Sequence, residues 1–390
     1  MYFRFRMRYR KLKADRIFDG YRFWDNHFLL IWEDGTIESI VDIREINEEI
    51  EEVSGILMPG LINCHCHLEL SHLKNRIPPH IGLVNFLLSV VQQREKREED
   101  KFQCIKAAEK EMFQNGIVAV ADICNTIDTI ETKKESNIYW YSLIEVINLH
   151  DESADKQLLK YEQMVQQYSN HNLQGVLTPH APYSVSKETF KKINDQTVNK
   201  IVSIHNQETV AENELFQKGE GEFLKMFTTF GIHQSPFAVT GKNSLQAWLP
   251  YFTNGQTILL VHNTFITEED IVFAKEHAEK NALKLVYCLC PNANLYIEDT
   301  LPPIDLLLKH NCEIVLGTDS YSSNWELSIT SEIRTIKENF IHLPLEEVLQ
   351  WATSKGAKAL GLNEFGCFET GKKPGIVLLD NNTFTVKRLI

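Results

Sequence analysis

Paired cysteines are missing from this sequence. Its eight cysteines are scattered along the chain, and no two of them stand in a C-x-x-C arrangement. This absence argues against a small secreted domain held by disulfides, and a chain of 390 residues can bury a core without them. We therefore expect reduced thiols and a cytoplasmic protein. Cys64 and Cys66 alternate with two histidines, and we interpret them as small buried residues rather than metal ligands.

Long apolar runs and a surplus of positive charge are also absent. No apolar run approaches about 18 residues, so we expect no membrane-spanning helix. The first residues, MYFRFRMRYRKLKAD, are basic, but no uninterrupted apolar stretch follows them, which argues against a signal peptide. The net charge of −13 argues against a nucleic-acid partner and against docking on anionic lipid. We expect a small-molecule partner instead.

The order of the expected elements divides the chain into three segments. Residues 1–56 and 365–390 contain short strands and turns, with a hairpin signal at Asp34-Gly35, and are predicted to form one small β-sandwich together. Residues 57–364 alternate apolar strands with helical stretches, one of which opens with a capping box of Thr267 and Asp270. This alternation predicts an α/β fold, a (β/α)8 TIM barrel. Its eight strands are expected at residues 56–67, 116–123, 138–147, 174–180, 201–208, 257–263, 284–290 and 313–319.

Unusual polar residues recur at the carboxyl ends of these expected strands. A TIM barrel builds its active site at that end of the strands, so side chains far apart in the sequence meet there. The sequence therefore predicts one site that combines residues from five strands. They are His65 and His67, His180, His205 and Glu208, His262, and Asp319.

His65 and His67 are the candidates that open a metal site. Residues two apart on a strand point to the same side, so both imidazoles can bind one ion. The alternative is that both rings fill the barrel interior, but buried imidazoles without partners are costly. His205 is the natural third nitrogen ligand, and Asp319 the natural carboxylate, with a helix N-cap as its alternative role. We expect one divalent metal ion, zinc first and iron second.

Three further roles follow from the chemistry of a metal-activated water. Such a water is a nucleophile near neutral pH, and Glu208 is placed to move its proton to a leaving group. Asp319 can share that proton, and His262 can hydrogen-bond the attacked centre or the developing anion. His180 is expected to contact substrate, with a fourth metal contact as the alternative. The alternatives for Glu208 and His262 are a surface carboxylate and a satisfied core histidine.

Six segments resemble, in order, the amidohydrolase superfamily and in particular its deaminase and chlorohydrolase branch. This resemblance implies a barrel with a small β-sandwich, the metal ligands His65, His67, His205 and Asp319, and Glu208 as proton shuttle. It also implies a mononuclear site, since strand four ends in His180 rather than lysine. A homodimer is the form that related proteins often take. The segments are MPGLINCHCHLELS, TPHAPYSVS, HNQETVAEN, VHNTFITEEDI, CPNANLYI and LGTDSYSSNWELSI.

Within this branch, PHAPYSVS is similar to enzymes that deaminate adenine-type rings, and HLELS is closest to the aminodeoxyfutalosine deaminases. The resemblance implies a hydrolytic deaminase, in which metal-bound hydroxide attacks the amino-bearing ring carbon and ammonia leaves. His180, Glu69 and Asn294 would contact the substrate, with a loop salt bridge as the alternative for Glu69. Hydrolysis of another C–N or C–Cl bond at the same metal site, and a non-catalytic metal-binding protein, are the competing hypotheses.

Overall fold

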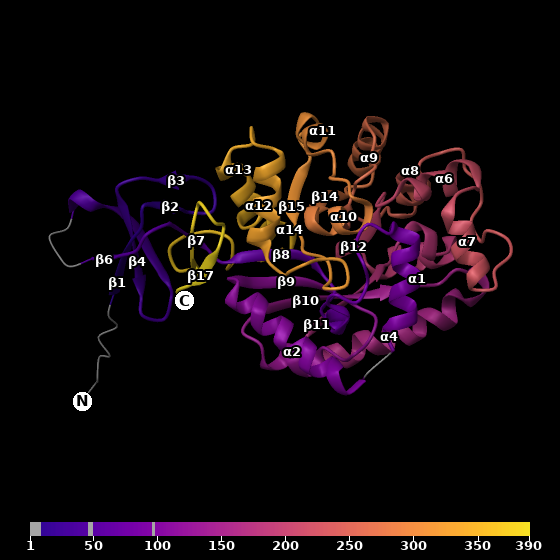
Figure 1. Cartoon of the computed structure of the whole chain (residues 1–390), viewed down its shortest axis with the longest axis horizontal. Helices are drawn as coiled ribbons and strands as arrows, with labels where there is room; N and C mark the ends of the chain where they lie inside the picture. The colour runs from indigo at the N-terminus through magenta and orange to yellow at the C-terminus, as the bar shows by residue number, and fades with distance from the viewer. Residues whose placement is uncertain (1–8, 46–49, 96–97) are drawn as a thin grey trace.

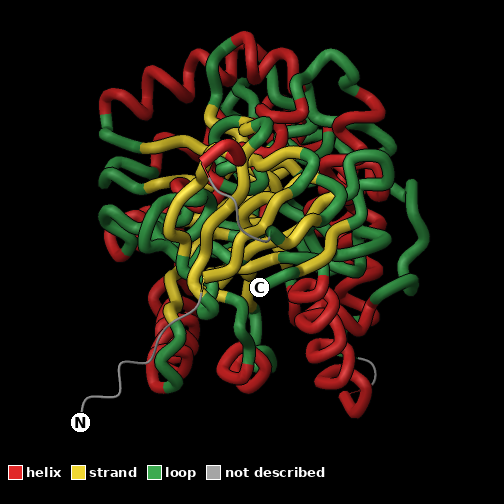
Figure 2. Tube along the Cα trace, turned by 90° about the vertical axis from the view of Figure 1, so that its left-hand side faces the viewer, coloured by secondary structure: helices red, strands yellow, loops and turns green. Residues whose placement is uncertain are grey.

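Both ends of the chain build one β-sandwich, as predicted. The computed structural model describes residues 9–45, 50–95 and 98–390, so parts of the expected N-terminal segment, residues 1–8 and 46–49, lie outside the described residues. Figure 1 shows the first strands beside the last ones, and Figure 2 looks onto this end of the molecule. One sheet has the order β5-β4-β1-β6 and the other β17-β16-β7-β2-β3. The strands are β1 Tyr9–Lys13, β2 Arg16–Phe18, β3 Phe23–Trp24, β4 His27–Trp32, β5 Ile37–Asp42, β6 Glu51–Glu52, β7 Ile56–Pro59, β16 Ile376–Leu379 and β17 Val386–Arg388.

Apolar side chains from both sheets share a core. Leu12 and Leu29 of one sheet lie in the same buried cluster as Ile17, Leu57 and Ile376 of the other. Strands β4 and β5 pair in antiparallel fashion around the turn that contains Gly35, whose φ of 84° suits glycine, so the predicted hairpin is confirmed.

All eight predicted barrel strands are present, in two parallel sheets of four. The sheets, β11-β10-β9-β8 and β12-β13-β14-β15, meet at both edges. The His205 N–H donates to the His180 carbonyl at 2.9 Å, and the backbone N–H groups of Thr318 and Asp319 donate to the His65 carbonyl at 3.0 Å. The strands are β8 Leu61–Cys66, β9 Ile117–Cys124, β10 Tyr139–Val146, β11 Gln174–Pro179, β12 Ile201–Asn206, β13 Thr257–His262, β14 Lys284–Leu289 and β15 Glu313–Leu316.

Helices surround these strands (Figure 1). In the helix that begins at Glu268, the predicted capping box is confirmed, because the Thr267 side chain accepts from the Asp270 N–H and the Asp270 carboxylate accepts from the Thr267 N–H. Among the described residues, no helix is both long and apolar enough to cross a membrane. The helices are α1 Leu83–Gln93, α2 Glu98–Gln114, α3 Ile130–Glu135, α4 Ala154–Asn170, α5 Lys187–Gln196, α6 Val210–Lys218, α7 Glu222–Thr229, α8 Ser244–Trp248, α9 Glu268–Lys280, α10 Pro291–Glu298, α11 Ile304–Lys309, α12 Ile329–Asn339, α13 Leu345–Trp351 and α14 Ser354–Ala359.

The first predicted strand, residues 56–67, is in fact two strands that belong to different sheets. β7 joins the sandwich and β8 begins the barrel, with Gly60 between them. The Gly60 N–H donates to the Pro374 carbonyl, and a Cβ at Gly60 would lie 2.8 Å from that oxygen and overlap Val118. Glycine is therefore required where the chain passes from one sheet to the other.

A buried ion pair supports the start of the barrel. Lys133 Nζ lies 2.6 Å from Asp122 Oδ2, and both side chains are fully buried. Lys133 also donates to the Ser142 hydroxyl at 2.9 Å. The other oxygen, Asp122 Oδ1, accepts the Leu68 backbone N–H at 2.7 Å. The pair therefore fixes the chain immediately after His67.

Replacing Lys133 with methionine is expected to destabilise the protein strongly. The variant leaves the Asp122 carboxylate buried without its cation, which typically costs about 3–5 kcal/mol. Urea unfolding measures the loss. The neighbouring Lys134 is a matched control, because it pairs with Glu131 at the surface and Lys134→Met should change the unfolding free energy by only about 0–1 kcal/mol. Equal losses in the two variants would contradict this assignment.

Candidate active site

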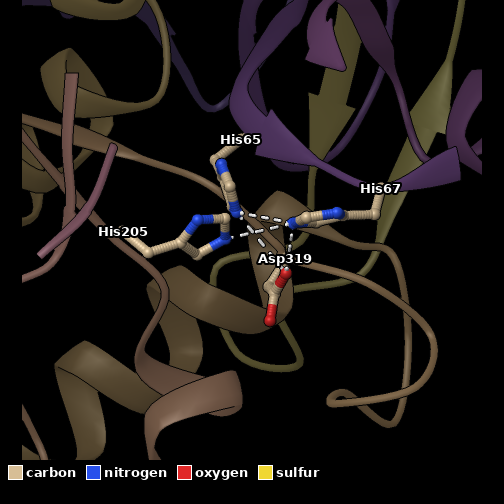
Figure 3. Close-up of side chains that lie close together, drawn as sticks. All are labelled: His65, His67, His205 and Asp319. Atoms are coloured by element: carbon tan, nitrogen blue, oxygen red, sulfur yellow. Dashed lines mark hydrogen bonds and ion pairs between the residues drawn. The ribbon is translucent and has the colours of Figure 1, made fainter. Parts of the chain in front are cut away.

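Four predicted ligands converge at the carboxyl ends of the barrel strands (Figure 3). The Nε2 atom of His67 lies 3.2 Å from Nε2 of His65 and 3.2 Å from Nε2 of His205. Asp319 Oδ1 lies 3.4 Å from His65 Nε2 and 3.3 Å from His67 Nε2. All four side chains are buried. The structure thus brings together three nitrogens and one oxygen around a single point.

These distances fit a metal ion. Donor atoms bound to zinc at lengths of about 2.0–2.1 Å lie about 3.3 Å from one another. Burial lowers the pKa of His65, His67 and His205, so their rings are neutral and can present lone pairs. The Nδ1–H of His205 donates to the His180 carbonyl at 2.9 Å, which leaves its Nε2 unprotonated and facing the other ligands. Converging lone pairs repel one another unless a cation lies between them.

Asp319 is held as an anion. Burial raises the pKa of its carboxyl, but His67 and the other facing histidines, together with the Ser323 hydroxyl, lower it further, so the net pKa lies below the ordinary value. The Ser323 hydroxyl donates to Oδ2 at 2.5 Å, leaving Oδ1 toward the histidines. The four residues can therefore hold one divalent ion.

A glycine lets the last barrel strand approach the first. At Gly317, a Cβ would lie 2.7 Å from the Cβ of His65 and 3.0 Å from Sγ of Cys288. Such contacts would force His65 away from its position. Gly317 therefore allows the segment that carries Asp319 to lie beside β8.

Strained backbone gathers at this end of the barrel. Gln207, His262, Asn263 and Asp319 have φ values of 47°, 73°, 58° and 57°. This left-handed conformation costs non-glycine residues on the order of 1–3 kcal/mol each and persists where surrounding bonds enforce it. The Asn263 N–H, for example, donates to the Asn206 carbonyl at 3.0 Å. Two of these four residues, His262 and Asp319, are also predicted site residues.

Glu208 lies beside the four ligands and close to His262. Its Oε1 is 3.5 Å from His262 Nε2, and both side chains are buried. Burial, followed by the nearby charge of Asp319, raises the pKa of Glu208 well above the ordinary value. The Asn294 amide donates to His262 Nδ1 at 3.4 Å, so the neutral ring carries its proton on Nε2, toward Glu208. Glu208 is thus suited to carry a proton in a dry site.

A cavity of about 130 Å³ opens beside Glu208 and the ligands. Helix α1 contributes much of its apolar lining, and the rest of the lining includes the polar residues of the site. Within the described chain, a larger cavity of about 460 Å³ lies elsewhere, around α5 and α8, and contains none of the candidate ligands. The smaller cavity is lined by His67, Leu70, Leu83, Phe86, Leu87, Val90, Val91, Arg94, Asn125, Glu145, Ile147, His180, Tyr183, His205, Glu208, Asp319, Ser320 and Ser322.

Helix α1 is fixed at both ends. At its start, the Leu83 N–H donates to Glu298 Oε1 at 2.7 Å. Just past its end, the Arg94 guanidinium donates to Glu69 Oε1 at 2.9 Å, and the Arg94 carbonyl lies 3.0 Å from His72 Nε2. The apolar wall of the cavity is therefore a fixed part of the site.

The three predicted substrate contacts lie in different places. His180 lines the cavity, with Nδ1 bonded to the Ser184 hydroxyl at 2.6 Å, and burial lowers its pKa to about 4. Glu69 does not line it, because its carboxylate is used by Arg94 and by the N–H groups of Asn125 and Thr126. Glu69 therefore takes the alternative role considered for it, a salt bridge between loops, rather than a substrate contact.

Asn294 is likewise not among the residues that line the cavity. Its amide donates to the Thr264 hydroxyl at 2.5 Å and to His262. It therefore lies behind His262 and orients that ring.

Sequence reasoning missed two charged residues of the cavity, Glu145 and Arg94. Glu145 follows the same rule as the other site residues, because it stands near the carboxyl end of a barrel strand, in IYWYSLIEVI. This position at a strand end was the signal in the sequence that could have identified Glu145. Arg94 stands in the charged stretch QQREKREED, where nothing distinguishes it from solvent-exposed neighbours.

Comparison with known proteins agrees with this geometry. A family model described as the amidohydrolase family matches residues 56–390. The chain belongs to the amidohydrolase family. As a member it is a hydrolase, and the resemblance seen in the six segments is confirmed.

Three individual relatives span most of the chain. The 5′-deoxyadenosine deaminase of Methanococcus vannielii is 27% identical over 364 residues, covering 87% of this chain and 79% of that protein. The aminofutalosine deaminase of Helicobacter pylori, solved with methylthio-coformycin, has a TM-score of 0.79 at 22% identity, covering 96% of this chain and 92% of that one. An adenosine deaminase from Xanthomonas campestris with bound zinc has a TM-score of 0.69 at 21% identity, covering 96% and 85%. The two structures confirm the predicted fold.

Metal binding is expected to follow the four ligands. The wild-type protein should bind one equivalent of Zn²⁺, and Zn²⁺ at 100 times its dissociation constant should add about 2.7 kcal/mol to the unfolding free energy. The variant His67→Ala should lose both effects. Equilibrium dialysis and thermal unfolding measure them. Cys66→Ala is the matched control, since Cys66 adjoins His67 but is not one of the clustered ligands, and loss of zinc in this variant would contradict the ligand set.

The stability of the protein is expected to depend on pH through Glu212. Burial raises the pKa of this carboxyl from 4.5 to about 7, while its Oε1 accepts the Gln207 N–H at 2.9 Å. Between these pH values the folded state binds more protons at Glu212 than the unfolded state, so the contribution of Glu212 to the unfolding free energy falls as the pH rises and levels off above about 7.

Glu212→Gln should remove this contribution. Urea unfolding from pH 4 to 8 gives the difference between the variant and the wild type. A difference that is constant across that window would refute the assignment.

Proposed function

We propose that this protein is a metal-dependent hydrolytic deaminase that acts on an aminated purine-type nucleoside. The observation that carries the proposal is the position of Glu208, a buried carboxyl with a raised pKa that lines the same cavity as His67, His205 and Asp319. A deaminase needs such a group because both the ring nitrogen and the departing amine must receive protons. The deaminase names of the similar proteins support the same conclusion.

The chain's own residues divide the work of the reaction. His65, His67, His205 and Asp319 would hold a divalent ion, whose chemical contribution when bound would be to make a water molecule nucleophilic at neutral pH. Glu208 gives its proton to the ring nitrogen next to the amino-bearing carbon and then carries the proton of the nucleophile to the leaving amine. Asp319, an anion at Oδ1, accepts a hydrogen bond from the attacking group. His262 Nε2, which has no hydrogen-bond partner among the described residues, can donate to the attacked centre.

The lining of the cavity suits a flat ring. The apolar face of α1, with Leu83, Phe86 and Val90, can cover the ring and exclude water. Excluding water strengthens the electrostatic contacts of Glu208 and Asp319 with the reacting atoms. The polar side of the cavity, with Glu145 and His180, remains for the sugar.

Zinc is the metal that we propose for this site. The spacings of 3.2–3.4 Å between the donor atoms fit zinc bond lengths, and the similar adenosine deaminase was solved with zinc. All eight cysteines are free, which supports a reducing compartment such as the cytoplasm.

Glu208→Gln is expected to lower kcat for ammonia release by a factor of about 10²–10⁴. The amide keeps the shape of the side chain but cannot transfer a proton. The assay follows ammonia from adenosine, 5′-deoxyadenosine and other aminopurine nucleosides with Zn²⁺ present. Bound zinc should remain at one equivalent, since Glu208 is not among the four ligands.

Glu214→Gln is the matched control for this variant. Glu214 lies on α6, the helix that follows Glu208, but does not line the cavity, so its variant should keep full activity. No ammonia from any nucleoside with zinc-loaded wild type, or release of chloride from chlorinated heterocycles instead, would overturn the deaminase assignment.

A further inference from the structure

Glu145 is a buried carboxylate that the mechanism above does not use. It stands near the carboxyl end of β10, is 2% exposed and lines the cavity next to His205. Its Oε2 accepts a hydrogen bond from Asn125 Nδ2 at 2.8 Å. Its Oε1 is buried and has no hydrogen-bond partner. A buried, unpaired carboxylate oxygen is costly, so this atom calls for a partner from outside the chain.

The orientation of His205 does not explain Glu145. The two side chains are close, with 3.6 Å between Glu145 Oε1 and His205 Nδ1. However, the Nδ1–H of His205 is already donated to the His180 carbonyl at 2.9 Å. A neutral ring has one N–H, so none is left for Glu145.

Arg94 does not neutralise Glu145 by a described contact either. Its guanidinium lines the same cavity, but the hydrogen bond that it makes goes to Glu69 Oε1 at 2.9 Å. Glu69 is itself a buried carboxylate, so Arg94 is paired within its own cluster.

A metal ion is a poor partner for Glu145. One atom each from Glu145, His180 and His205 lie within 4.8 Å of one another, which is a spacing that metal ligands can adopt. Yet His205 offers no free nitrogen, because Nδ1 donates to a carbonyl and Nε2 faces the four-ligand site. Nδ1 of His180 is bonded to the Ser184 hydroxyl. Glu145 and His180 thus form a pair of adjacent acceptors, but they supply too few ligands for a cation. Hydroxyl donors suit them better.

We propose that Glu145 is a substrate-binding residue that accepts a hydrogen bond from one of the two vicinal hydroxyl groups, 2′ or 3′, of the nucleoside sugar. The proposal rests on the proposed function and narrows its substrate class to ribonucleosides. A vicinal diol presents two O–H donors side by side, which matches Glu145 and the adjacent ring of His180. A 5′-deoxynucleoside, the substrate named for one relative, retains both of these hydroxyls.

The test compares Glu145→Gln with the wild type on adenosine, 2′-deoxyadenosine and 3′-deoxyadenosine, each with zinc-loaded protein. The amide loses the charge of the acceptor while it keeps the shape of the side chain. For adenosine, we expect KM to rise on the order of tenfold to a hundredfold with kcat changed little, as for a lost hydrogen bond to a charged group. For at least one deoxynucleoside the two proteins should have similar KM values, because the hydroxyl that Glu145 binds is missing.

Glu332→Gln is the matched control. Glu332 is also a fully buried carboxylate, but it accepts from the Asn292 N–H and the Asn324 amide and does not line the cavity. Any loss in this variant should fall equally on adenosine and on the deoxynucleosides. Binding of inosine, the deamination product of adenosine, measured by calorimetry, gives a second readout that needs no turnover, and Glu145→Gln should weaken it by a similar factor.

The outcomes separate the two proposals. Unchanged KM and unchanged inosine binding in Glu145→Gln, or an equal loss for all three nucleosides, would overturn the role of Glu145 and leave the deaminase assignment intact. Inosine binding that depends on Glu145, without ammonia release from any nucleoside, would support the sugar contact and overturn the proposed reaction. Absence of both turnover and inosine binding in the wild type would overturn both.

Discussion

The contact between the first and last barrel strands is the constraint on which the site depends. Two backbone N–H groups, of Thr318 and Asp319, donate to one carbonyl, that of His65. This contact places a carboxylate beside two histidines that lie far away in the sequence. It requires Gly317, because a side chain there would meet His65 itself. Closure of the barrel and assembly of the ligand set are thus the same event.

The surrounding polar residues stabilise this arrangement in a buried site. The strained backbone at Asp319 and His262 is held by hydrogen bonds to neighbouring strands and loops. The ion pair of Asp122 and Lys133 anchors the chain directly after His67 through the Leu68 N–H. The two carboxyl pKa values shift in opposite directions, because burial raises that of Glu208, whereas at Asp319 the facing histidines and the Ser323 hydroxyl outweigh burial and lower it. One remains an anion while the other is suited to carry a proton.

Much of the fold and the metal cluster follows from two regularities of the sequence. Apolar strands alternate with helices, and histidines or acids stand at the strand ends, so parallel topology alone brings His65, His205 and Asp319 to one face. Gly60 was not foreseen as a break, since the run ILMPGLI is apolar on both sides of it and does not show to which sheet each half belongs.

Side chains on loops were harder to predict than those on strands. Glu69 follows the histidines directly, but it turns toward Arg94 and the Asn125 loop rather than the cavity. That direction depends on how three loops pack, which no local pattern encodes. Glu145 was missed for a different reason. Its strand is apolar and aromatic, and a single acid within it resembles an interruption rather than a site residue.

The division of the cavity into two sides has an evolutionary consequence. The reactive groups stand on barrel strands or directly after them, whereas the apolar wall comes from one helix, α1, tied down by Glu298 and Arg94. Mutations on that helix can therefore remodel what the pocket admits while the reaction centre stays intact. Related enzymes that keep the same reaction can in this way change their substrate range through single substitutions on α1.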